Sequence, residues 1–394
     1  MAREEQPPSD LVPSRSFGQV PGFDGVRGAA VLTIVIAHMV VLLPVHALLV
    51  IPGATASLDA FFVLSGFLIS ALLLKEQAKR GTIGAVPFYR RRVLRLLPAL
   101  YVMVLVTALF AYFTHQWQHT ETQSIFSVVF YYSNYYSASD PSPFGIPKLT
   151  IGFQHLWSLS FEEQFYVFWP WITIVLLTIR TRLRTVVIVL LSLIALVALH
   201  RFLLFQETHR WWQILIRTDT RADAILWGAL VAHLWIRGKE PKRGIRFAAL
   251  VASVYLLGCL FLTTEYSPFV FWGGFVGIDI SCAVILLAIL DGRWIGRHVF
   301  EFRPLVALGL VSYGFYLWHL PVFFAVAHYD AHWNDVVRVV VALSITLALT
   351  LLSWFLMERP LMRWSKKLSA RDEARRAAAG GAAGGPPEPA VGTG

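Results

Sequence analysis

An arginine and a histidine share the first long hydrophobic segment of the chain. Arg27 and His38 are separated by ten residues in the stretch FDGVRGAAVLTIVIAH. In a helix, eleven positions at about 100° each place both side chains on one face, about 16 Å apart along the axis. If Arg27 lies at a membrane edge, His38 lies near mid-bilayer, where an ionisable side chain is costly and indicates function. The alternative is a histidine packed against a neighbouring helix.

A second group consists of arginines in the stretch FYRRRVLRLLP, which spans residues 88–98. Arg91 and Arg95 are four positions apart, and Arg92 and Arg95 are three apart, so the three can converge on one side of a helix. Guanidinium groups bind phosphates bidentately. The cluster therefore indicates a phosphate site, with simple anchoring at the cytoplasmic membrane surface as the alternative.

A third group lies in the stretch HLWSLSFEEQFY, which begins at His155. On a helix, His155, Ser158 and Glu162 fall on one stripe. Ser160 followed by Glu163 also fits a capping box, with a helix that begins near Ser160. Two adjacent acids exceed what a cap requires, so we expect at least one of Glu162 and Glu163 to be functional.

Two further pairs are candidate substrate-binding residues. In SYGFYLWHLPV, Tyr316 and His319 lie about one helical turn apart; an aromatic membrane belt and a histidine that caps the helix before Pro321 are the alternatives. In DTRADAILWG, Arg221 and Asp223 lie at the outer end of another hydrophobic segment. These two charges either bind substrate or pair with each other at the membrane edge.

The elements that must position these residues are membrane helices. The 394 residues are 56% hydrophobic and 15% charged, with a mean hydropathy of +0.60. The apolar residues form runs long enough to cross a bilayer, so we predict an all-α, polytopic transmembrane helical bundle of about ten spans. The run from Ser124 to Tyr136 is too short and too aromatic for a span and is expected to be interfacial or re-entrant. The predicted spans are 28–48, 58–75, 96–114, 161–179, 185–205, 221–236, 246–263, 270–290, 304–327 and 337–357.

The basic residues orient these spans. Ten spans place both termini on one side of the membrane, and only six of the 34 Lys and Arg residues then fall on the opposite side. Because cytoplasmic loops are enriched in Lys and Arg, both termini are predicted to be cytoplasmic. The net charge of +10 is scattered over loops, which indicates contact with the lipid bilayer and no binding of nucleic acid. The six residues on the other side are Lys148, Arg201, Arg210, Arg217, Arg221 and Arg338.

The chain divides into one membrane domain and two tails. Residues 1–20 are polar and Pro-rich and are expected to be a disordered cytoplasmic tail, and residues 21–363 form the membrane domain. Residues 364–394 are predicted to be a cytoplasmic tail, first basic, with a short surface helix, and then low-complexity. Cys259 and Cys282 both fall in predicted helices and are expected to be small buried residues, so we predict no metal site and no disulfide.

Seven segments, in their order along the chain, resemble the acyltransferase family 3 membrane proteins. These are ten-helix bacterial O-acyltransferases of surface carbohydrates and macrolide-type antibiotics. The resemblance covers most of residues 20–363. Some members carry a hydrolase-like domain after the helical bundle, and this chain resembles a stand-alone form without one. The matching segments are Arg27-x10-His38, FFVLSGFLIS at 61–70, RRVLR at 91–95, HLWSLSFEEQFY at 155–166, DTRADA at 219–224, SYGFYLWH at 312–319 and ERP at 358–360.

The resemblance implies an enzyme of the bacterial cytoplasmic membrane. Such an enzyme moves an acyl group, usually acetyl, from cytoplasmic acyl-CoA to a hydroxyl of a carbohydrate, glycolipid or macrolide-type acceptor. Acyl-CoA is a co-substrate, and no cofactor is bound permanently. Arg27 and His38 match the essential pair of the family, and its basic motif matches the cluster Arg91, Arg92 and Arg95.

A mechanism follows as a hypothesis. The cytoplasmic arginines would hold the CoA phosphates, while His38 would act as general base or as a transient acyl carrier. Glu162 or Glu163, with His155 and His319, would line the outward half, where the acceptor is received. The competing class is a transporter or flippase of an anionic or acylated molecule, which also uses intramembrane ionisable groups. The sequence shows no internal repeat, which argues against a transporter built from two related halves.

Overall fold

The computed structural model describes residues 18, 20–43, 50–115, 120–139, 152–178, 181–329 and 333–383, without the side chains of residues 120, 121 and 373–383. All regular structure in these ranges is helical. Nearly all of the predicted N-terminal tail, and the C-terminal tail from residue 384 onward, lie outside the described residues.

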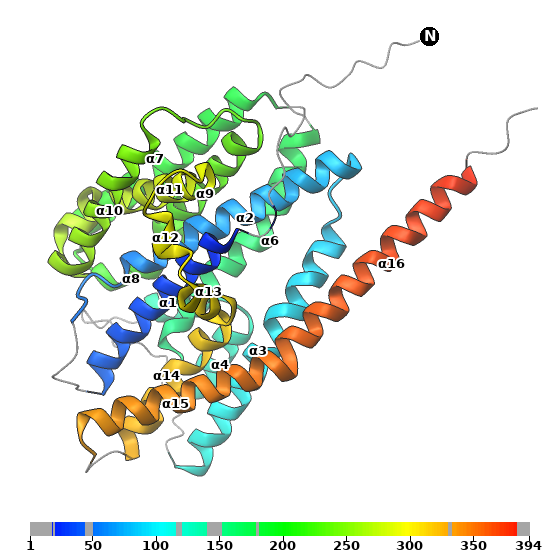
Figure 1. Cartoon of the computed structure of the whole chain (residues 1–394). Helices are drawn as coiled ribbons and strands as arrows, with labels where there is room; N and C mark the ends of the chain where they lie inside the picture. Colours follow the sequence, from blue (N-terminus) through cyan, green and yellow to red (C-terminus); the bar gives the residue numbers. More distant parts are fainter. Residues whose placement is uncertain are drawn as a thin grey trace, which may run out of the picture.

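Long helices make up most of the molecule, and short helices connect them (Figure 1). The long helices are α1 (Pro21–Leu42), α2 (Ala56–Arg80), α3 (Ala85–Phe113), α6 (Trp157–Thr178), α7 (Leu183–Thr208), α9 (Thr218–Ile236), α10 (Ile245–Leu262), α11 (Phe275–Asp291), α14 (Ser312–Tyr329), α15 (Asp335–Ser353) and α16 (Arg359–Ala383). The short ones are α4 (Thr120–Val129), α5 (Ser133–Ala138), η2 (Gln154–Leu156), α8 (Trp211–Ile216), η3 (Val270–Gly274), α12 (Arg297–Phe300), α13 (Arg303–Leu310) and η4 (Trp354–Glu358).

The predicted fold class, a helical membrane bundle, is confirmed. Seven helices are long and apolar enough to cross a membrane, and the pair α13–α14, bent by 76°, supplies an eighth candidate. Helices α6 and α9 coincide with the two remaining predicted spans. They contain 22 and 19 residues, which at about 1.5 Å per residue is close to the thickness of the hydrocarbon core. The number of crossings and the side of the termini stay predictions.

Two stretches outside the predicted spans are also helical. The run from Ser124 to Tyr136 forms α4 and α5, which have 10 and 6 residues and are too short to cross a bilayer, as predicted. The chain from α15 through the π-helical turn η4 into α16 is one continuous helix, so the predicted domain boundary at residue 363 falls inside a helix. The end of α16 stands away from the other helices (Figure 1). An ion pair of 2.8 Å between Arg90 and Asp372 links it to α3.

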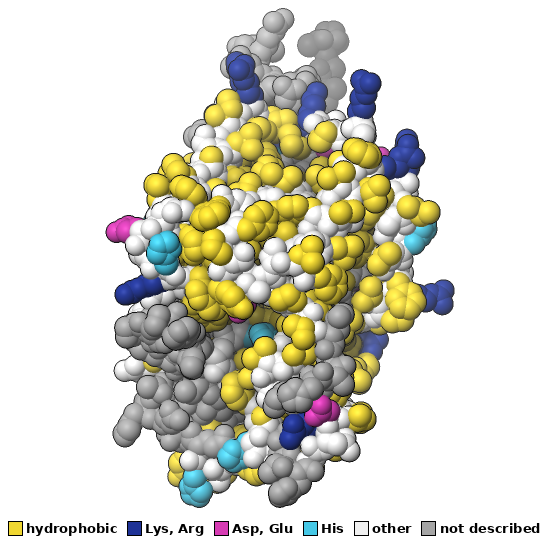
Figure 2. Space-filling model, turned by 90° about the vertical axis from the view of Figure 1, so that its left-hand side faces the viewer, with side chains coloured by type: hydrophobic (Ala, Val, Ile, Leu, Met, Phe, Trp, Pro, Cys, Tyr) yellow, Lys and Arg dark blue, Asp and Glu magenta, His cyan; other side chains and the backbone are white. Residues whose placement is uncertain are grey.

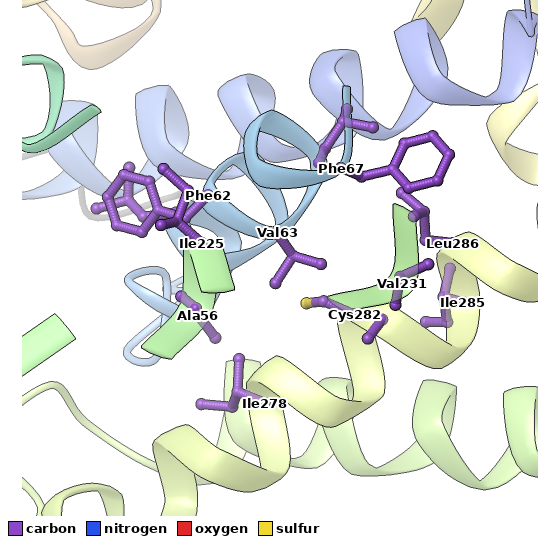
Figure 3. Packing of buried hydrophobic residues seen from close by; sticks show 14 of the residues in the cluster. Ala56, Phe62, Val63, Phe67, Ile225, Val231, Ile278, Cys282, Ile285 and Leu286 are labelled. Carbon is purple, nitrogen blue, oxygen red and sulfur yellow. The ribbon is translucent and has the colours of Figure 1, made fainter. Parts of the chain in front are cut away.

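Helix α2 is deeply packed and contacts α9 and α11, which also contact each other (Figure 3). The backbones of α2 and α9 come into contact at two glycines. A Cβ added at Gly66 would overlap the carbonyl oxygen of Ile225, and one added at Gly228 would overlap that of Val63. Small residues allow this close approach between membrane helices, which depend on packing for their association. The apolar side chains around this contact include Phe62 and Phe67 of α2, Val231 of α9, and Ile278, Cys282 and Ile285 of α11 (Figure 3).

Two ion pairs, with side chains no more than 1% exposed, connect α2, α7 and α9. Arg221 of α9 pairs with Asp59 of α2, and Arg201 of α7 pairs with Asp223 of α9 at 2.7 Å. Arg221 and Asp223 thus each have their partner on another helix, and the structure does not show them paired with each other. A buried charge that loses its partner is strongly destabilising, so these pairs constrain how the three helices sit together.

The surface is that of a lipid-facing protein. On the face shown in Figure 2, hydrophobic side chains cover a broad middle zone, and several Lys and Arg side chains project at its upper end. In the most apolar stretches of long helices such as α3 and α7, only 28% and 22% of the residues are buried, and the others are at least partly exposed. An apolar exterior on this scale requires hydrocarbon around it.

Candidate active site

One cavity of about 480 Å³ collects most of the candidate residues. They come from four helices that lie far apart in the sequence, because α1, α3, α6 and α14 each contribute one face to it. The predicted convergence of the three α3 arginines is confirmed. The candidates that line this arginine cavity are Arg27, Arg91, Arg92, Arg95, Glu162, Glu163 and Tyr316.

Carboxylates neutralise part of the positive charge of this cavity. Glu163 pairs with Arg92 at 3.4 Å, and Arg92 also lies over the ring of Tyr166. Glu162 accepts hydrogen bonds from Ser65 of α2 (3.1 Å) and from Tyr166 (3.2 Å). The acids therefore join α6 to α2 and α3, which gives both of them a defined place among the arginines.

Arg95 has no such partner. It is exposed, lines the arginine cavity, and forms no ion pair or hydrogen bond with any residue that the structure describes. Arg27 is only loosely paired, since its nearest carboxylate oxygen, on Asp24, lies 3.7 Å away. Four guanidinium groups face two carboxylates here. The cavity is therefore suited to an anion, and Arg95 is the group best placed to bind it.

Three histidines meet next to this cavity. His38 Nδ1 and His319 Nε2 are 2.9 Å apart, and their rings are nearly parallel, at 16°, with centroids 5.2 Å apart. The His155 ring packs edge-on against His319 at 4.9 Å. Tyr316 connects the group to η2 and α6, because its hydroxyl donates to the His155 carbonyl oxygen and is 2.6 Å from Ser158 Oγ.

The hydrogen bonds of this cluster determine where the protons are. His319 Nδ1 lies 2.6 Å from the carbonyl oxygen of Tyr316. A carbonyl oxygen can only accept, so His319 Nδ1 carries the proton, and Nε2 of the neutral ring is an acceptor. His38 must then donate from Nδ1, which leaves Nε2 of His38 unprotonated. That nitrogen has no hydrogen-bond partner among the described residues.

A second cavity, of about 570 Å³, lies on the other side of the histidine cluster. His38 and His155 line it, whereas His319 is fully buried and lines neither cavity. Leu58 and Tyr316 line both cavities and form the wall between them. The histidine cluster is thus located where two separate binding spaces come closest.

Some of the predicted placements need revision. Glu162 and Glu163 line the arginine cavity and do not lie beside His155. The first residues of α6, which follow His155 in the chain, place the two acids about two helical turns away from it. The alternative helix start at Ser160 is wrong, since α6 begins at Trp157 and Ser160 Oγ bonds Ser133 Oγ at 2.7 Å. Arg221 and Asp223 line neither cavity.

Sequence reasoning missed several residues of the site. Ser65 and Tyr166 bind Glu162, and Glu76 lies 3.5 Å from Arg91. Ser65 is a polar residue within an apolar span, which was an available signal. Among the described residues, no group of three or more His, Cys, Asp or Glu side chains could hold a metal ion. Cys259 and Cys282 are free, buried thiols.

A helical membrane bundle that surrounds adjoining histidine and arginine sites defines the class of this protein. The chain matches the sequence model of the family described as "Acyltransferase domain" over residues 20–358, and it belongs to that family. No solved structure matches the chain.

The chain is similar to several bacterial proteins. YrhL of Bacillus subtilis, a candidate peptidoglycan O-acetyltransferase, is 30% identical over 357 residues, which are 87% of this chain and 55% of that protein. The peptidoglycan O-acetyltransferase OatA of Listeria monocytogenes is 29% identical over 316 residues, 77% of this chain and 49% of OatA. A candidate O-acetyltransferase of Staphylococcus aureus (strain COL) is 31% identical over 354 residues, 86% and 57% of the two chains. The chain thus spans about half the length of these relatives.

Proposed function

We propose that this protein is a membrane O-acetyltransferase that moves an acetyl group from acetyl-CoA to a hydroxyl of a cell-envelope carbohydrate. The family supports the reaction class, and the names of the relatives support a carbohydrate acceptor such as peptidoglycan. The observation that carries the proposal is the arginine cavity, which adjoins a histidine with a free ring nitrogen across a wall of two side chains.

The donor fits the arginine cavity. Phosphate groups of CoA need cationic partners, and Arg95, with Arg27, Arg91 and Arg92 around it, supplies them at one end of the bundle. Arg27 and His38 are eleven residues apart on α1, about 16 Å along the axis. The pantetheine arm, at about 1.5 Å per bond, spans 15–20 Å. A thioester anchored by its phosphates at the arginines therefore reaches the histidine cluster.

His38 acts as the general base. The acceptor hydroxyl gives its proton to His38 Nε2 as its oxygen attacks the thioester carbonyl, and the C–S bond breaks as the C–O bond forms. His38 then returns the proton to the thiolate, which leaves as CoA. His319 is the positioning residue in this scheme. Because its Nε2 accepts a hydrogen bond from His38 Nδ1, it keeps Nε2 of His38 free and stabilises the imidazolium that forms.

The two glutamates then have a positioning role. Glu163 holds Arg92, and Glu162 holds the adjoining wall of Ser65 and Tyr166. Both act on the donor side, through the arginines, and neither contacts the acceptor in this scheme. Arg221 and Asp223 stabilise the packing of α2, α7 and α9.

The test uses native membranes that contain the protein, supplied with acetyl-CoA labelled in the acetyl group. Label should move to envelope glycan with the wild type. It should fall by about 10²–10⁴-fold with His38→Ala, the range expected for loss of a general base. Arg95→Ala should weaken binding of CoA to the purified protein by about 10–100-fold, as expected for one charged hydrogen bond.

Arg243→Ala is the matched control, because Arg243 is an exposed arginine that lines neither cavity. It should leave both readouts unchanged. Transport of an intact acylated molecule, without transfer of the labelled acetyl group to a new hydroxyl, would contradict the proposal and support a flippase.

A further inference from the structure

The second cavity lies at the opposite end of the bundle from the arginines. Along α1, Arg27 lines the arginine cavity, whereas the second cavity is lined from Ile34 to Leu42. Along α2 the order is reversed. Ser65 and Leu72, further along this helix, line the arginine cavity, whereas Leu58, near its start, lines both cavities. The two cavities therefore extend in opposite directions from the histidine cluster.

Helix α14 and Trp157 of α6 also line it, and its remaining walls come from connections on a single side of the predicted membrane. They are the segment before α2, η2, the short helix α8, and the turn between α10 and η3. All four connections are external in the topology that the Lys and Arg distribution predicts. The second cavity is therefore at the outer end of the bundle.

The chemistry of this cavity differs from that of the arginine cavity. No Lys or Arg side chain is among its described lining residues, so nothing there would neutralise the phosphates of CoA. Its rim is aromatic. The ring centroid of Trp211 lies 5.8 Å from that of Trp212 and 5.9 Å from that of Tyr266, and Tyr266 is 58% exposed. Beside them, Glu265 forms no hydrogen bond or ion pair with any described residue.

We propose that this cavity binds the carbohydrate acceptor, with Trp211 and Tyr266 packing against a sugar ring and Glu265 accepting hydrogen bonds from its hydroxyls. The inference rests on the proposed function and adds the location and chemistry of the second substrate. A sugar ring has an apolar face of C–H groups and a rim of hydroxyl donors, and it needs both kinds of partner in one place. The volume of about 570 Å³ is within the usual range for a small-ligand site.

The position explains how the acceptor meets the base. His38 is partly exposed and lines this cavity, and the hydrogen bonds leave its Nε2 unprotonated and without a partner among the described residues. Both ring nitrogens of His155 are buried, and His319 lies behind His38. A hydroxyl that enters from the outer end thus reaches His38, while the thioester arrives from the arginine side.

The experiment separates acceptor binding from donor binding. CoA affinity is measured by calorimetry on the purified protein, and transfer of labelled acetyl groups to envelope glycan is measured in native membranes. Trp211→Ala and Glu265→Gln should each reduce transfer by at least about tenfold and leave CoA affinity at the wild-type value. Trp211→Phe, which keeps an aromatic face, should retain most of the transfer.

Trp272→Ala is the matched control. Trp272 is 59% exposed on η3 and lines neither cavity, so both readouts should stay unchanged. Wild-type transfer by both Trp211→Ala and Glu265→Gln would overturn the inference, and so would loss of CoA binding in Trp211→Phe. If the wild type itself transfers no label, it is the proposed function that fails.

Discussion

At the scale of single residues, the arrangement of protons around His38 is the central feature. Sequence alone singled out Arg27, His38 and the α3 arginines as candidates, because their spacing fits a helix. It could not identify the partner of His38, since His319 is 281 positions away and the contact depends on how α1 and α14 pack. The backbone carbonyl of Tyr316 then decides which nitrogen of each ring carries a proton, and no side-chain pattern reveals that.

This arrangement predicts distinct effects of two substitutions at His319. His319→Leu removes the acceptor of the hydrogen bond from His38 Nδ1, so His38 can hold its proton on Nε2, the nitrogen that acts as the base in the proposed reaction. In serine proteases the wrong histidine tautomer costs about 10⁴-fold, and we expect a loss of about 10²–10⁴-fold in the rate of acetyl transfer at saturating acetyl-CoA.

His319→Gln is the matched variant, because its side-chain oxygen can accept the same hydrogen bond from His38 Nδ1. It should be clearly faster than His319→Leu. CoA affinity should be unchanged in both, which separates positioning of His38 from general damage to the fold. Equal rates for the Leu and Gln variants would show that His319 does not act through the His38 proton.

At the scale of elements, the contact of α2 with α9 holds the two sides of the site together. Helix α2 contributes Leu58 to the wall between the cavities and Ser65 to the arginine cavity. The sequence predicted both helices within a few residues, from their apolar runs. It gave no sign of the Arg221–Asp59 pair, whose members are 162 positions apart, since a charge inside an apolar span shows that a partner exists but not where it lies.

The glycines at this contact provide a test. Gly228→Ala should lower the thermal midpoint of the purified protein, because its methyl group would overlap the Val63 carbonyl oxygen and push α2 away, at a cost of about 1–3 kcal/mol. Gly258→Ala on α10 is the matched control, since no atom lies within 4 Å of its added Cβ.

The control should be neutral or stabilising by up to about 1 kcal/mol, the gain in helix propensity from Gly to Ala. The measurement is thermal unfolding in detergent, followed by the loss of the folded peak in size-exclusion chromatography. The same midpoint for Gly228→Ala and Gly258→Ala would mean that the backbone contact does not limit stability.

At the scale of the whole molecule, the two cavities extend in opposite directions from the histidine cluster, and the Lys and Arg distribution predicts that the arginine cavity faces the cytoplasm. The helices and their order were predictable because apolar runs report burial in hydrocarbon directly. The bend of 76° between α13 and α14 and the continuation of α15 into α16 were not, because both depend on local backbone geometry and not on the hydrophobic pattern.

Membrane orientation is testable with two cysteine variants that flank α10. Lys242→Cys lies in the connection before this helix and Ser267→Cys in the connection after it. With the predicted topology, a membrane-impermeant maleimide should label Ser267→Cys on intact cells and Lys242→Cys only after permeabilisation. The native cysteines are buried, so background labelling should be low. The reverse pattern would contradict the orientation, and labelling of both on intact cells would contradict a crossing by α10.

The thin wall formed by Leu58 and Tyr316 determines how the membrane voltage bears on the proposed reaction. Where solvent-filled spaces reach toward each other from the two faces, most of the transmembrane voltage falls across the material that remains between them. In the proposed reaction a proton moves inward from the hydroxyl to the thiol of CoA, while the acetyl group moves outward and leaves its bonding electron pair on sulfur. The two displacements carry equal and opposite charge, so a turnover moves no net charge across the wall. Acetylation would then proceed to the same equilibrium in energised and de-energised cells, driven by the thioester alone.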